Sequence, residues 1–218
     1  TLICVFFIPS LVLPKKVVAF GGKLTGYWAI FCLRTILSIK IELRGAQNIL
    51  KNEKFFIACT HQSEFETFYL QTLYNAPFFI LKKELLSIPV FGQLLKKLGC
   101  IAIVRNKIDK ENLGFIENVE NSINNNISPL IIFPQGTRYK TSDRPNFKKG
   151  VERIYNLKNI KCQPIVMNSG DIWPKTGMLS SNKKIIISIL PSIEKNLQNI
   201  KFLDVLQTKM YNELDLIL

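Results

Sequence analysis

The first residues with a chemical pattern are a histidine and a glutamate five positions apart. His61, the only histidine in the chain, follows the apolar run FFIACT, and a histidine just past a strand is well placed for a binding pocket. Glu66, in the first turn of the helix expected next, would come back within reach of the ring. There it could fix the tautomer of His61 and stabilise the imidazolium that forms when the ring removes a proton. The pair predicts a general base with an orienting acid.

The same segment also fits two different roles. Ser63 and Glu66 match the S-x-x-E capping box, so Glu66 could serve to begin a helix, and capping and catalysis can coexist. Cys59 lies two residues before His61, on the same face of an extended strand, so a Cys–His nucleophile pair is a further hypothesis. Retained activity in a Cys59→Ala variant would eliminate that hypothesis.

Three cations follow further apolar runs, as His61 follows FFIACT. Lys82 ends FFILK, Arg105 comes directly after CIAIV, and Arg138 closes the segment FPQGTR, which overlaps the run LIIF. The carboxyl ends of parallel strands meet at one edge of a sheet, so these side chains are expected near His61. Lysine meets a phosphate as a point charge, and arginine can grip it bidentately. The set predicts a phosphate-bearing substrate held beside a general base.

The segment FPQGTR, residues 133–138, is the most informative of these. Its glycine, Gly136, lets backbone amides approach a ligand closely, and Thr137 and Arg138 add hydrogen-bond donors. A tight turn of this composition would be ordinary in isolation. Its place as the third strand end with a cation favours a role in binding.

The elements that must position these residues alternate along the chain from residue 39 onward. Short apolar or alternating runs predict strands, and the stretches between them predict helices. This alternation predicts one α/β domain with a mainly parallel sheet flanked by helices. The expected strands are 39–43, 54–60, 78–82, 100–104, 130–133, 163–167 and 184–189, and the expected helices are 63–74, 84–98, 109–125, 148–157 and 201–217.

Two apolar segments precede this domain. Residues 2–13 are uncharged but too short to span a bilayer, which needs about 20 apolar residues in a helix, and a chain that opens with threonine suggests a longer protein. Residues 17–39 carry Lys23, Arg34 and a Tyr27–Trp28 pair, which suits a helix embedded in one leaflet. We therefore predict membrane-associated helices over 1–38 and the α/β domain over 39–218. The alternative is that these helices pack on the domain.

Composition favours an anionic partner without choosing one. Lys and Arg number 29 against 16 Asp and Glu, and the net charge of +13 suits a phosphate, an acidic membrane, a nucleic acid or an acidic carrier protein. The five cysteines are far apart and form no CxxC, and one histidine is too few for a Cys/His zinc site. We expect buried, reduced thiols in a reducing compartment, and no metal.

Four segments, taken in order, resemble the blocks of the glycerolipid acyltransferase family, the lysophosphatidic acid acyltransferases in particular. They are HQSEFE, GCIAIVR, FPQGTR and QPIVMNSG, and they extend over about residues 55–170. Any one block is a weak signal, whereas four in the family's order and spacing are specific.

The resemblance implies a role for each matching residue. His61 would be the base and Glu66 its orienter, standing where the family more often has the shorter Asp. Gln135 stands where the family usually has Glu, which puts a charge-dependent task at that position in doubt. Lys82, Arg105 and Arg138 would hold the glycerol phosphate, and Pro164 would help to shape the acyl or substrate pocket. The substrate-binding residues implied are Lys82, Arg105, Gly136, Thr137, Arg138 and Pro164.

The resemblance also implies a reaction. The base would remove the proton of the free sn-2 hydroxyl of 1-acylglycerol 3-phosphate, and the alkoxide would attack a thioester without a covalent acyl-enzyme. The donor would be acyl-CoA or acyl carrier protein, with no other cofactor, and the product would be phosphatidic acid for phospholipid biosynthesis. The expected location is the bacterial inner membrane, with the site facing the cytoplasm and no nucleic acid as partner.

Other functions remain open at this point. The same chemistry could act on another lysophospholipid or on glycerol 3-phosphate. A thioesterase or lipase is disfavoured because no G-x-S-x-G is present. A basic nucleic-acid-binding or membrane-binding module without catalysis would account for the net charge, but for neither the His–Glu pair nor the cations at the strand ends.

Overall fold

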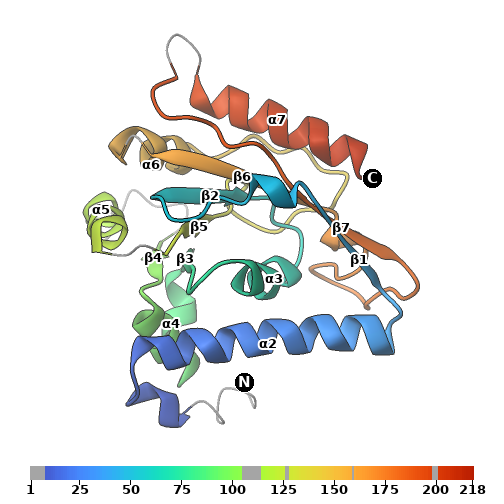
Figure 1. Ribbon diagram of the computed structural model, residues 1–218, viewed down its shortest axis with the longest axis horizontal. Coiled ribbons are helices and arrows are strands. Elements are labelled where there is room, and N and C mark those ends of the chain that lie inside the picture. The colour runs from blue at the N-terminus through green and yellow to red at the C-terminus, as the bar shows by residue number, and fades with distance from the viewer. Residues whose placement is uncertain (1–7, 105–113, 126–127, 159, 198–200) are drawn as a thin grey trace.

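The computed structural model describes residues 8–104, 114–125, 128–158, 160–197 and 201–218, in which strands and helices alternate (Figure 1). Arg105 and residues 109–113 of the expected helix 109–125 lie outside these ranges. The strands are β1 (Lys40–Arg44), β2 (Phe55–Cys59), β3 (Phe78–Lys82), β4 (Ile101–Ile103), β5 (Leu130–Ile132), β6 (Lys161–Met167) and β7 (Lys184–Ile189). The helices are α2 (Lys15–Ile36), α3 (Phe65–Leu73), α4 (Phe91–Leu98), α5 (Phe115–Asn125), α6 (Gly150–Lys158) and α7 (Phe202–Leu216), with short 3-10 turns such as η1 (Ile8–Leu11) and η3 (Lys83–Ser87).

The described strands form one sheet in the order β1-β7-β6-β2-β5-β3-β4. Strands β6, β2, β5, β3 and β4 all run in the same direction. Strand β7 is antiparallel to β6, and β1 is parallel to β7. The prediction of a mainly parallel sheet is therefore confirmed. Because β2, β5 and β3 are neighbours with the same direction, the segments that follow them emerge at one edge.

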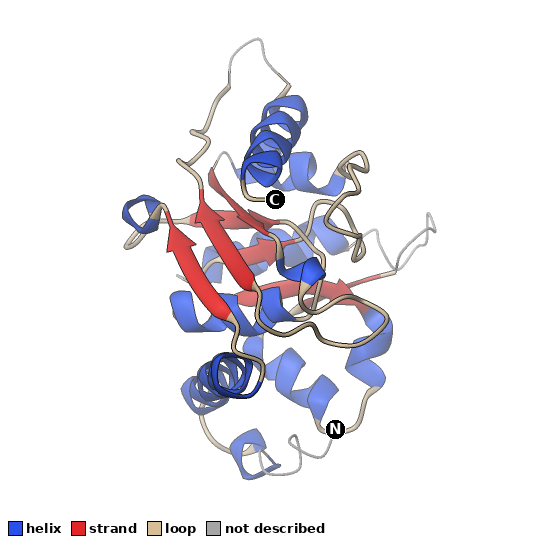
Figure 2. Cartoon of the chain, turned by 90° about the vertical axis from the view of Figure 1, so that its right-hand side faces the viewer, coloured by secondary structure: helices blue, strands red, loops and turns tan. Residues whose placement is uncertain are grey.

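Helices cover both faces of the sheet (Figures 1 and 2). On one face, α5, α6 and α7 pack on Phe56 and Ala58 of β2. On the other face, α3 packs on Ile57 and Cys59 of the same strand. Since both faces are buried, the whole strand is apolar, as is usual for a parallel sheet between helices.

Helix α2 lies outside α3 and packs directly against it (Figure 1). Gly26 permits the close approach, because a Cβ atom at this position would lie 2.5 Å from the carbonyl oxygen of Phe68 and 2.7 Å from Cγ2 of Thr72. Any residue other than glycine would push the two helices apart. The alternative prediction, that the N-terminal helices pack on the domain, is correct for this face of α2.

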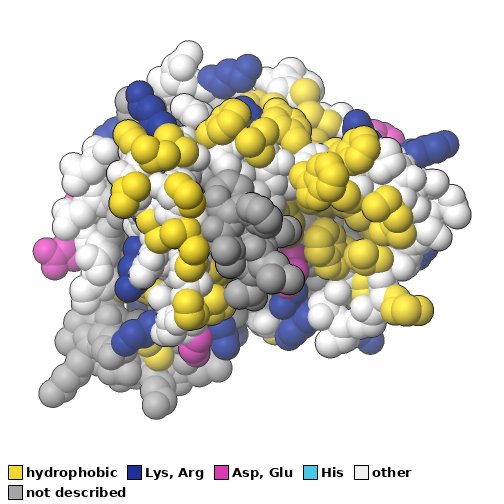
Figure 3. Space-filling view, turned by 90° about the horizontal axis from the view of Figure 1, so that it is seen from below, with side chains coloured by type: hydrophobic (Ala, Val, Ile, Leu, Met, Phe, Trp, Pro, Cys, Tyr) yellow, Lys and Arg dark blue, Asp and Glu magenta, His cyan; other side chains and the backbone are white. Residues whose placement is uncertain are grey.

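The opposite face of α2 is apolar and exposed to solvent. Its exposed side chains recur at helical spacing, at Phe20, Leu24, Tyr27, Trp28 and Phe31. Figure 3 shows hydrophobic side chains gathered on the side of the molecule where α2 lies. Among the described residues, no helix is both long enough and apolar enough to cross a membrane. That residues 17–39 lie embedded in one leaflet stays a prediction, and this exposed apolar face is the surface that would enter the leaflet.

Candidate active site

Hydrogen bonds fix the end of β2, where the candidate catalytic residues begin. The hydroxyl of Thr60 accepts the amide of Met167, in β6, at 3.0 Å. The next residue, His61, donates its amide to Oε1 of Gln135 at 2.6 Å, and its carbonyl accepts the amide of Tyr139 at 3.0 Å. Strand β6 and the loop after β5 therefore hold the backbone on either side of His61.

His61 and Glu66 lie together, as their spacing predicts. Nδ1 of His61 is 3.4 Å from Oε2 of Glu66, which is longer than the roughly 2.9 Å of an ideal hydrogen bond. Such contacts are often long without substrate and tighten in its complex. The His61 side chain is 14% exposed, and that of Glu66 is 0% exposed. Because the carboxylate lies at Nδ1, Nε2 is the ring nitrogen that can accept a proton from a substrate.

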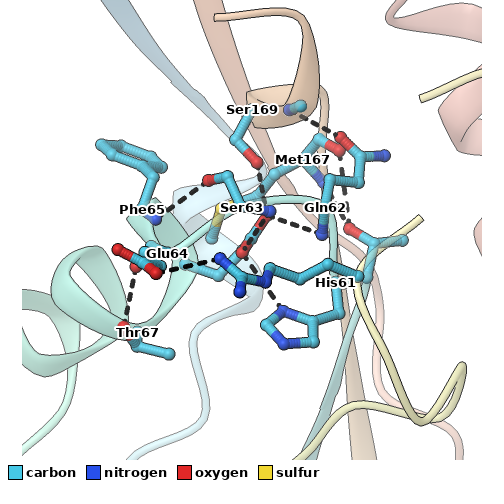
Figure 4. A network of polar contacts seen from close by, with 12 residues as sticks. His61, Gln62, Ser63, Glu64, Phe65, Thr67, Met167 and Ser169 are labelled. Carbon is cyan, nitrogen blue, oxygen red and sulfur yellow. Dashed lines mark hydrogen bonds and ion pairs between the residues drawn. The ribbon is translucent and has the colours of Figure 1, made fainter. Parts of the chain in front are cut away.

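Donors from two loops surround the carboxylate of Glu66, as Figure 4 shows for Gln62, Ser63 and Ser169. Oε1 accepts the amides of Gln62 at 3.1 Å and Ser63 at 3.0 Å, and Oε2 also accepts the amide of Ser63 at 3.0 Å. The hydroxyl of Ser169, just after β6, donates to Oε1. A buried carboxylate requires such compensation, and these donors hold it in one orientation toward His61.

Glu66 also has the capping role that its spacing from Ser63 predicts. The acid reaches back to the amide of Ser63, which is half of a capping box, and the hydroxyl of Ser63 accepts the amide of Phe65 at 2.9 Å. Helix α3 begins at Phe65. One carboxylate therefore both begins the helix and faces the imidazole, so the geometry of the base depends on the start of α3.

Aromatic rings fix the plane of the imidazole. The ring of His61 stacks on that of Phe133, with 3.9 Å between centroids and 17° between planes. Phe133 in turn stacks on Phe79, with centroids 6.3 Å apart. Phe79 belongs to β3, Phe133 directly follows β5, and His61 is the second residue after β2. The column therefore joins three neighbouring strands and restricts rotation of His61.

The segment FPQGTR begins with a tight turn. The amide of Gly136 donates to the carbonyl of Phe133 at 2.9 Å, and Gly136 has a φ of +79°, in the left-handed region that glycine adopts readily. Gln135 is buried in this turn, and its Oε1 accepts the amide of His61. A neutral amide oxygen is sufficient for that contact, so position 135 has a task here that needs no charge.

Arg138 comes directly after this turn and is anchored beside the base. The residue that follows it, Tyr139, donates its amide to the carbonyl of His61. Nη1 of Arg138 donates to Oε1 of Glu64 at 3.0 Å. The structure thus brings Arg138 to the segment between His61 and the start of α3.

The other two predicted cations differ in what the structure reveals. Lys82 is the last residue of β3, at the same edge of the sheet, and its side chain is 50% exposed with Nζ 3.9 Å from Oε1 of Glu84. Arg105 lies outside the described residues. Proximity to the His61 loop is therefore observed for Arg138, and for Lys82 the structure gives the shared sheet edge.

A family model described as Acyltransferase matches residues 40–168, which is more than half of the chain. The chain belongs to the acyltransferase family. The matched range contains His61, Glu66 and the segment FPQGTR.

Two relatives within the acyltransferase family are named 1-acyl-sn-glycerol-3-phosphate acyltransferase. The protein from Pseudomonas aeruginosa is 31% identical over 166 residues, which are 76% of this chain and 64% of that protein. The protein from Helicobacter pylori is 30% identical over 189 residues, which are 85% of this chain and 77% of that protein. The match therefore spans a little under two thirds of the Pseudomonas protein.

A solved acyltransferase structure has the same fold. The crystal structure of the 1-acyl-sn-glycerophosphate (LPA) acyltransferase PlsC from Thermotoga maritima matches with a TM-score of 0.75 over 93% of this chain and 81% of that chain. The sequence identity is 18%, so this likeness concerns the architecture. It supports the predicted α/β sheet flanked by helices.

The remaining predicted residues of the acyltransferase site are placed as follows. Thr137 is partly buried in the loop before Arg138. Pro164 is buried within β6, opposite Ala58 of β2 and three residues before the strand ends at Met167. It therefore lies inside the sheet, and a role in shaping a pocket stays a prediction.

The cysteines of the chain agree only in part with the prediction of buried, reduced thiols. Cys59 and Cys162 are buried and reduced, whereas Cys32 and Cys100 are reduced but partly exposed, and Cys4 lies outside the described residues. Burial, and then the charge of Glu66, raise the pKa of the Cys59 thiol well above its usual value. A thiol that is enclosed and protonated is a poor nucleophile, which argues against the Cys–His hypothesis.

Ser169 is a site residue that the sequence patterns did not single out. It lies one position past the matched range, in the segment QPIVMNSG. The available signal was a hydroxyl residue just past β6, because β6 pairs in parallel with β2 and ends at the same edge. Within the described residues, no group of three or more His, Cys, Asp or Glu side chains is placed to hold a metal ion.

Proposed function

We propose that this acyltransferase moves a fatty acyl group from a thioester to the sn-2 hydroxyl of 1-acylglycerol 3-phosphate, which gives phosphatidic acid. The observation that carries the proposal is the buried His61–Glu66 pair with Arg138 anchored on the same loop. This places a proton acceptor beside a cation suited to phosphate. The names of the Pseudomonas and Helicobacter relatives support the same acceptor.

His61 would act as the general base. Its Nε2 takes the proton of the acceptor hydroxyl while the hydroxyl oxygen attacks the thioester carbonyl carbon. The carbon–sulfur bond then breaks, and the imidazolium returns the proton to the leaving thiolate. Glu66, held by Gln62, Ser63 and Ser169, stabilises the imidazolium between these two transfers. The acyl group passes directly between the substrates, without a covalent enzyme intermediate.

Backbone amides would stabilise the developing oxyanion. Several amides near His61 already donate to acceptors within the protein, which reduces the number of candidates. The amide of His61 donates to Gln135, and those of Gln62 and Ser63 donate to Glu66. The amide of Gly136 closes its own turn. Since these donors already have acceptors, we propose the amides of Thr137 and Arg138 for this role.

Arg138 would bind the phosphate of the acceptor, with Lys82, Arg105 and Thr137 as further ligands. A guanidinium offers two parallel donors to phosphate oxygens, whereas a lysine contributes a single charge. The hydroxyl of Thr137 and the backbone at Gly136 would complete the contact. This assignment for Lys82 and Arg105 rests on the family resemblance and their expected place at the sheet edge.

The exposed face of α2 would dock the enzyme on one leaflet of a membrane, because both the acceptor and the product are lipids. Phe20, Tyr27, Trp28 and Phe31 supply apolar area and interfacial rings. An apolar groove of about 210 Å³, lined in part by Leu33, Trp173 and Leu179, adjoins α2. Sedimentation with anionic vesicles tests this proposal, and protein that stays in the supernatant contradicts it.

The remaining assignments are part of the same proposal. The donor would be acyl-CoA or acyl carrier protein. Both are negatively charged, and the net charge of +13 on this chain favours their binding. Residues 1–38 would be the membrane-docking segment and residues 39–218 the catalytic domain. The location we propose is the cytoplasmic face of a bacterial inner membrane.

The test is acyl transfer by the full chain in mixed micelles, with labelled acyl-CoA or acyl carrier protein and 1-acylglycerol 3-phosphate. Wild type is expected to form labelled phosphatidic acid, and His61→Ala to lower kcat by about 10²–10⁴-fold with its fold intact. Phosphatidic acid, which lacks the free hydroxyl, serves as the acceptor control. Equal turnover by His61→Ala would overturn the assignment of the base.

A panel of acceptors separates the proposal from its alternatives. Faster transfer to another lysophospholipid or to glycerol 3-phosphate would reassign the acceptor and keep the chemistry. If the protein bound vesicles but transferred no acyl group from either donor to any acceptor of the panel, it would instead be a membrane-binding module without catalysis.

A further inference from the structure

Arg138, the cation brought to the loop of the base, already has an anionic partner in the protein. Its Nη1 lies 3.0 Å from Oε1 of Glu64. The Arg138 side chain is 28% exposed and that of Glu64 is 55% exposed. The pair joins the loop after β5 to the start of α3, three residues beyond His61.

Capping of α3 does not account for the carboxylate of Glu64. Glu64 directly precedes the first residue of α3, its backbone is already helical, with φ −81° and ψ −16°, and its side chain makes no capping hydrogen bond. The first amides of the helix have other acceptors: the hydroxyl of Ser63 accepts from Phe65, and the carbonyl of Glu64 accepts from Thr67. The carboxylate is thus directed at Arg138 instead.

We propose that Glu64 is a built-in competitor of the acceptor phosphate and tunes headgroup affinity. The inference rests on the proposed function, in which Arg138 binds that phosphate. An arriving phosphate must share the guanidinium with Glu64 or displace it from Nη1. Either way, the carboxylate keeps its negative charge beside a phosphate that carries nearly two at neutral pH.

The sign of the effect follows from the two contributions of Glu64. Orienting Arg138 favours phosphate binding, but an exposed ion pair contributes little to holding a side chain. Repulsion between the carboxylate and a dianion only a few ångströms away is the larger effect. Glu64 therefore weakens binding of the headgroup. Substrate and product share this headgroup, so weaker binding also favours release of the product.

The experiment compares wild type with Glu64→Gln, which keeps the shape and removes the charge. At low ionic strength, KM for 1-acylglycerol 3-phosphate is expected to fall about threefold to tenfold. The inhibition constant of glycerol 3-phosphate, used as a competing headgroup, should fall in parallel. Both differences should shrink at about 0.5 M salt, because salt screens exposed charges.

Glu194→Gln is the matched control. Glu194 is 62% exposed and pairs with Lys161, at the amino-terminal end of β6 and thus at the opposite edge of the sheet. This variant makes the same change of net charge without a neighbour in the site, so KM should stay at the wild-type value. A fall in KM in both variants would mean a general charge effect and would overturn the role of Glu64.

The outcomes separate this inference from the proposed function. Absence of transfer by wild type would contradict the proposed function itself. Transfer by wild type, a raised KM in Arg138→Ala and an unchanged or raised KM in Glu64→Gln would contradict only the role of Glu64. In the Arg138→Ala background, the effect of Glu64→Gln should become smaller, because without the guanidinium the phosphate is no longer held beside the carboxylate.

Discussion

The candidate site has two regions that are built differently. In the buried region, the Glu66 carboxylate is 0% exposed and receives hydrogen bonds from Gln62, Ser63 and Ser169 in addition to its contact with His61. At the exposed rim, Arg138 and Lys82 each pair with a single acid that is itself more than half exposed. A proton transfer depends on one fixed geometry, whereas a lipid headgroup that must enter and leave suits partners that exchange easily.

This difference predicts which kinetic constant each region controls. Changes in the buried region should lower kcat, because they disturb the base after the substrate has bound. Changes at the rim should act mainly on KM for the phosphate-bearing acceptor. A variant in the buried region that alters only KM, or a variant at the rim that alters only kcat, would contradict this division of roles.

The largest effect is expected from Glu66→Gln. In either orientation of the new side chain, its NH2 group would face the amide of Ser63, which contacts both carboxylate oxygens, and a neutral amide could not stabilise the imidazolium. We expect kcat to fall about 10²–10⁴-fold. The free energy of unfolding should also decrease by about 1–3 kcal/mol, because a buried donor loses its partner. Steady-state kinetics and thermal unfolding of the same preparation measure both.

Glu66→Asp sharpens this prediction. It introduces the acid that the family resemblance implies at this position and keeps the charge, but it shortens the reach to His61. An intermediate loss of kcat is expected. A wild-type kcat in Glu66→Gln would show that no charge is needed beside Nδ1 of His61. It would contradict the claim that the buried region controls kcat.

The next largest effect is expected from Arg138→Ala. Hydrogen bonds to a charged partner contribute about 1.5–3 kcal/mol, so KM for 1-acylglycerol 3-phosphate should rise about 10-fold to 100-fold. Arg138→Lys should recover part of this loss, since lysine keeps the charge without the planar pair of donors. A fall in kcat at an unchanged KM would instead place Arg138 in the chemical step. Initial rates over a range of acceptor concentrations distinguish these results.

Short-range patterns were enough to predict most of the fold and the central pair. The expected strands 78–82 and 184–189 coincide with β3 and β7, because continuous apolar runs with clear ends mark buried strands. The contact of His61 with Glu66 followed from five residues of spacing at the start of a helix. Local geometry alone determines such features.

The features that were not predicted depend on contacts across the fold. The hydroxyl of Ser169 and the carboxylate of Glu66 are 103 residues apart in sequence, and Arg138 and Glu64 are 74 apart. Their pairing depends on the register of β6 and β5 against β2, which no local pattern specifies. Apolar residues lie on both faces of α2, so the sequence pattern alone does not tell the packed face from the exposed one. Only the close approach at Gly26 reveals which face packs on α3.

The smallest effect is expected from Ser169→Ala, and it tests how far rigidity around Glu66 matters. The variant removes one donor to Oε1, while the amides of Gln62 and Ser63 remain in place. We expect kcat to fall about threefold to tenfold, with KM for both substrates unchanged and about 1–2 kcal/mol lost from the free energy of unfolding. Ser169→Thr, which keeps the hydroxyl, should restore part of kcat.

Ser188→Ala is a control of the same kind for this last variant. The hydroxyl of Ser188, in β7, donates to Oε1 of Glu213, in α7, at 2.6 Å, so the substitution removes another Ser–Glu hydrogen bond. Ser188→Ala should lose similar stability and keep its kcat, because Glu213 does not contact His61. If both variants lost kcat equally, the effect of Ser169 would be a consequence of stability alone. A selective loss in Ser169→Ala would show that the orientation of Glu66, beyond its charge, limits the base.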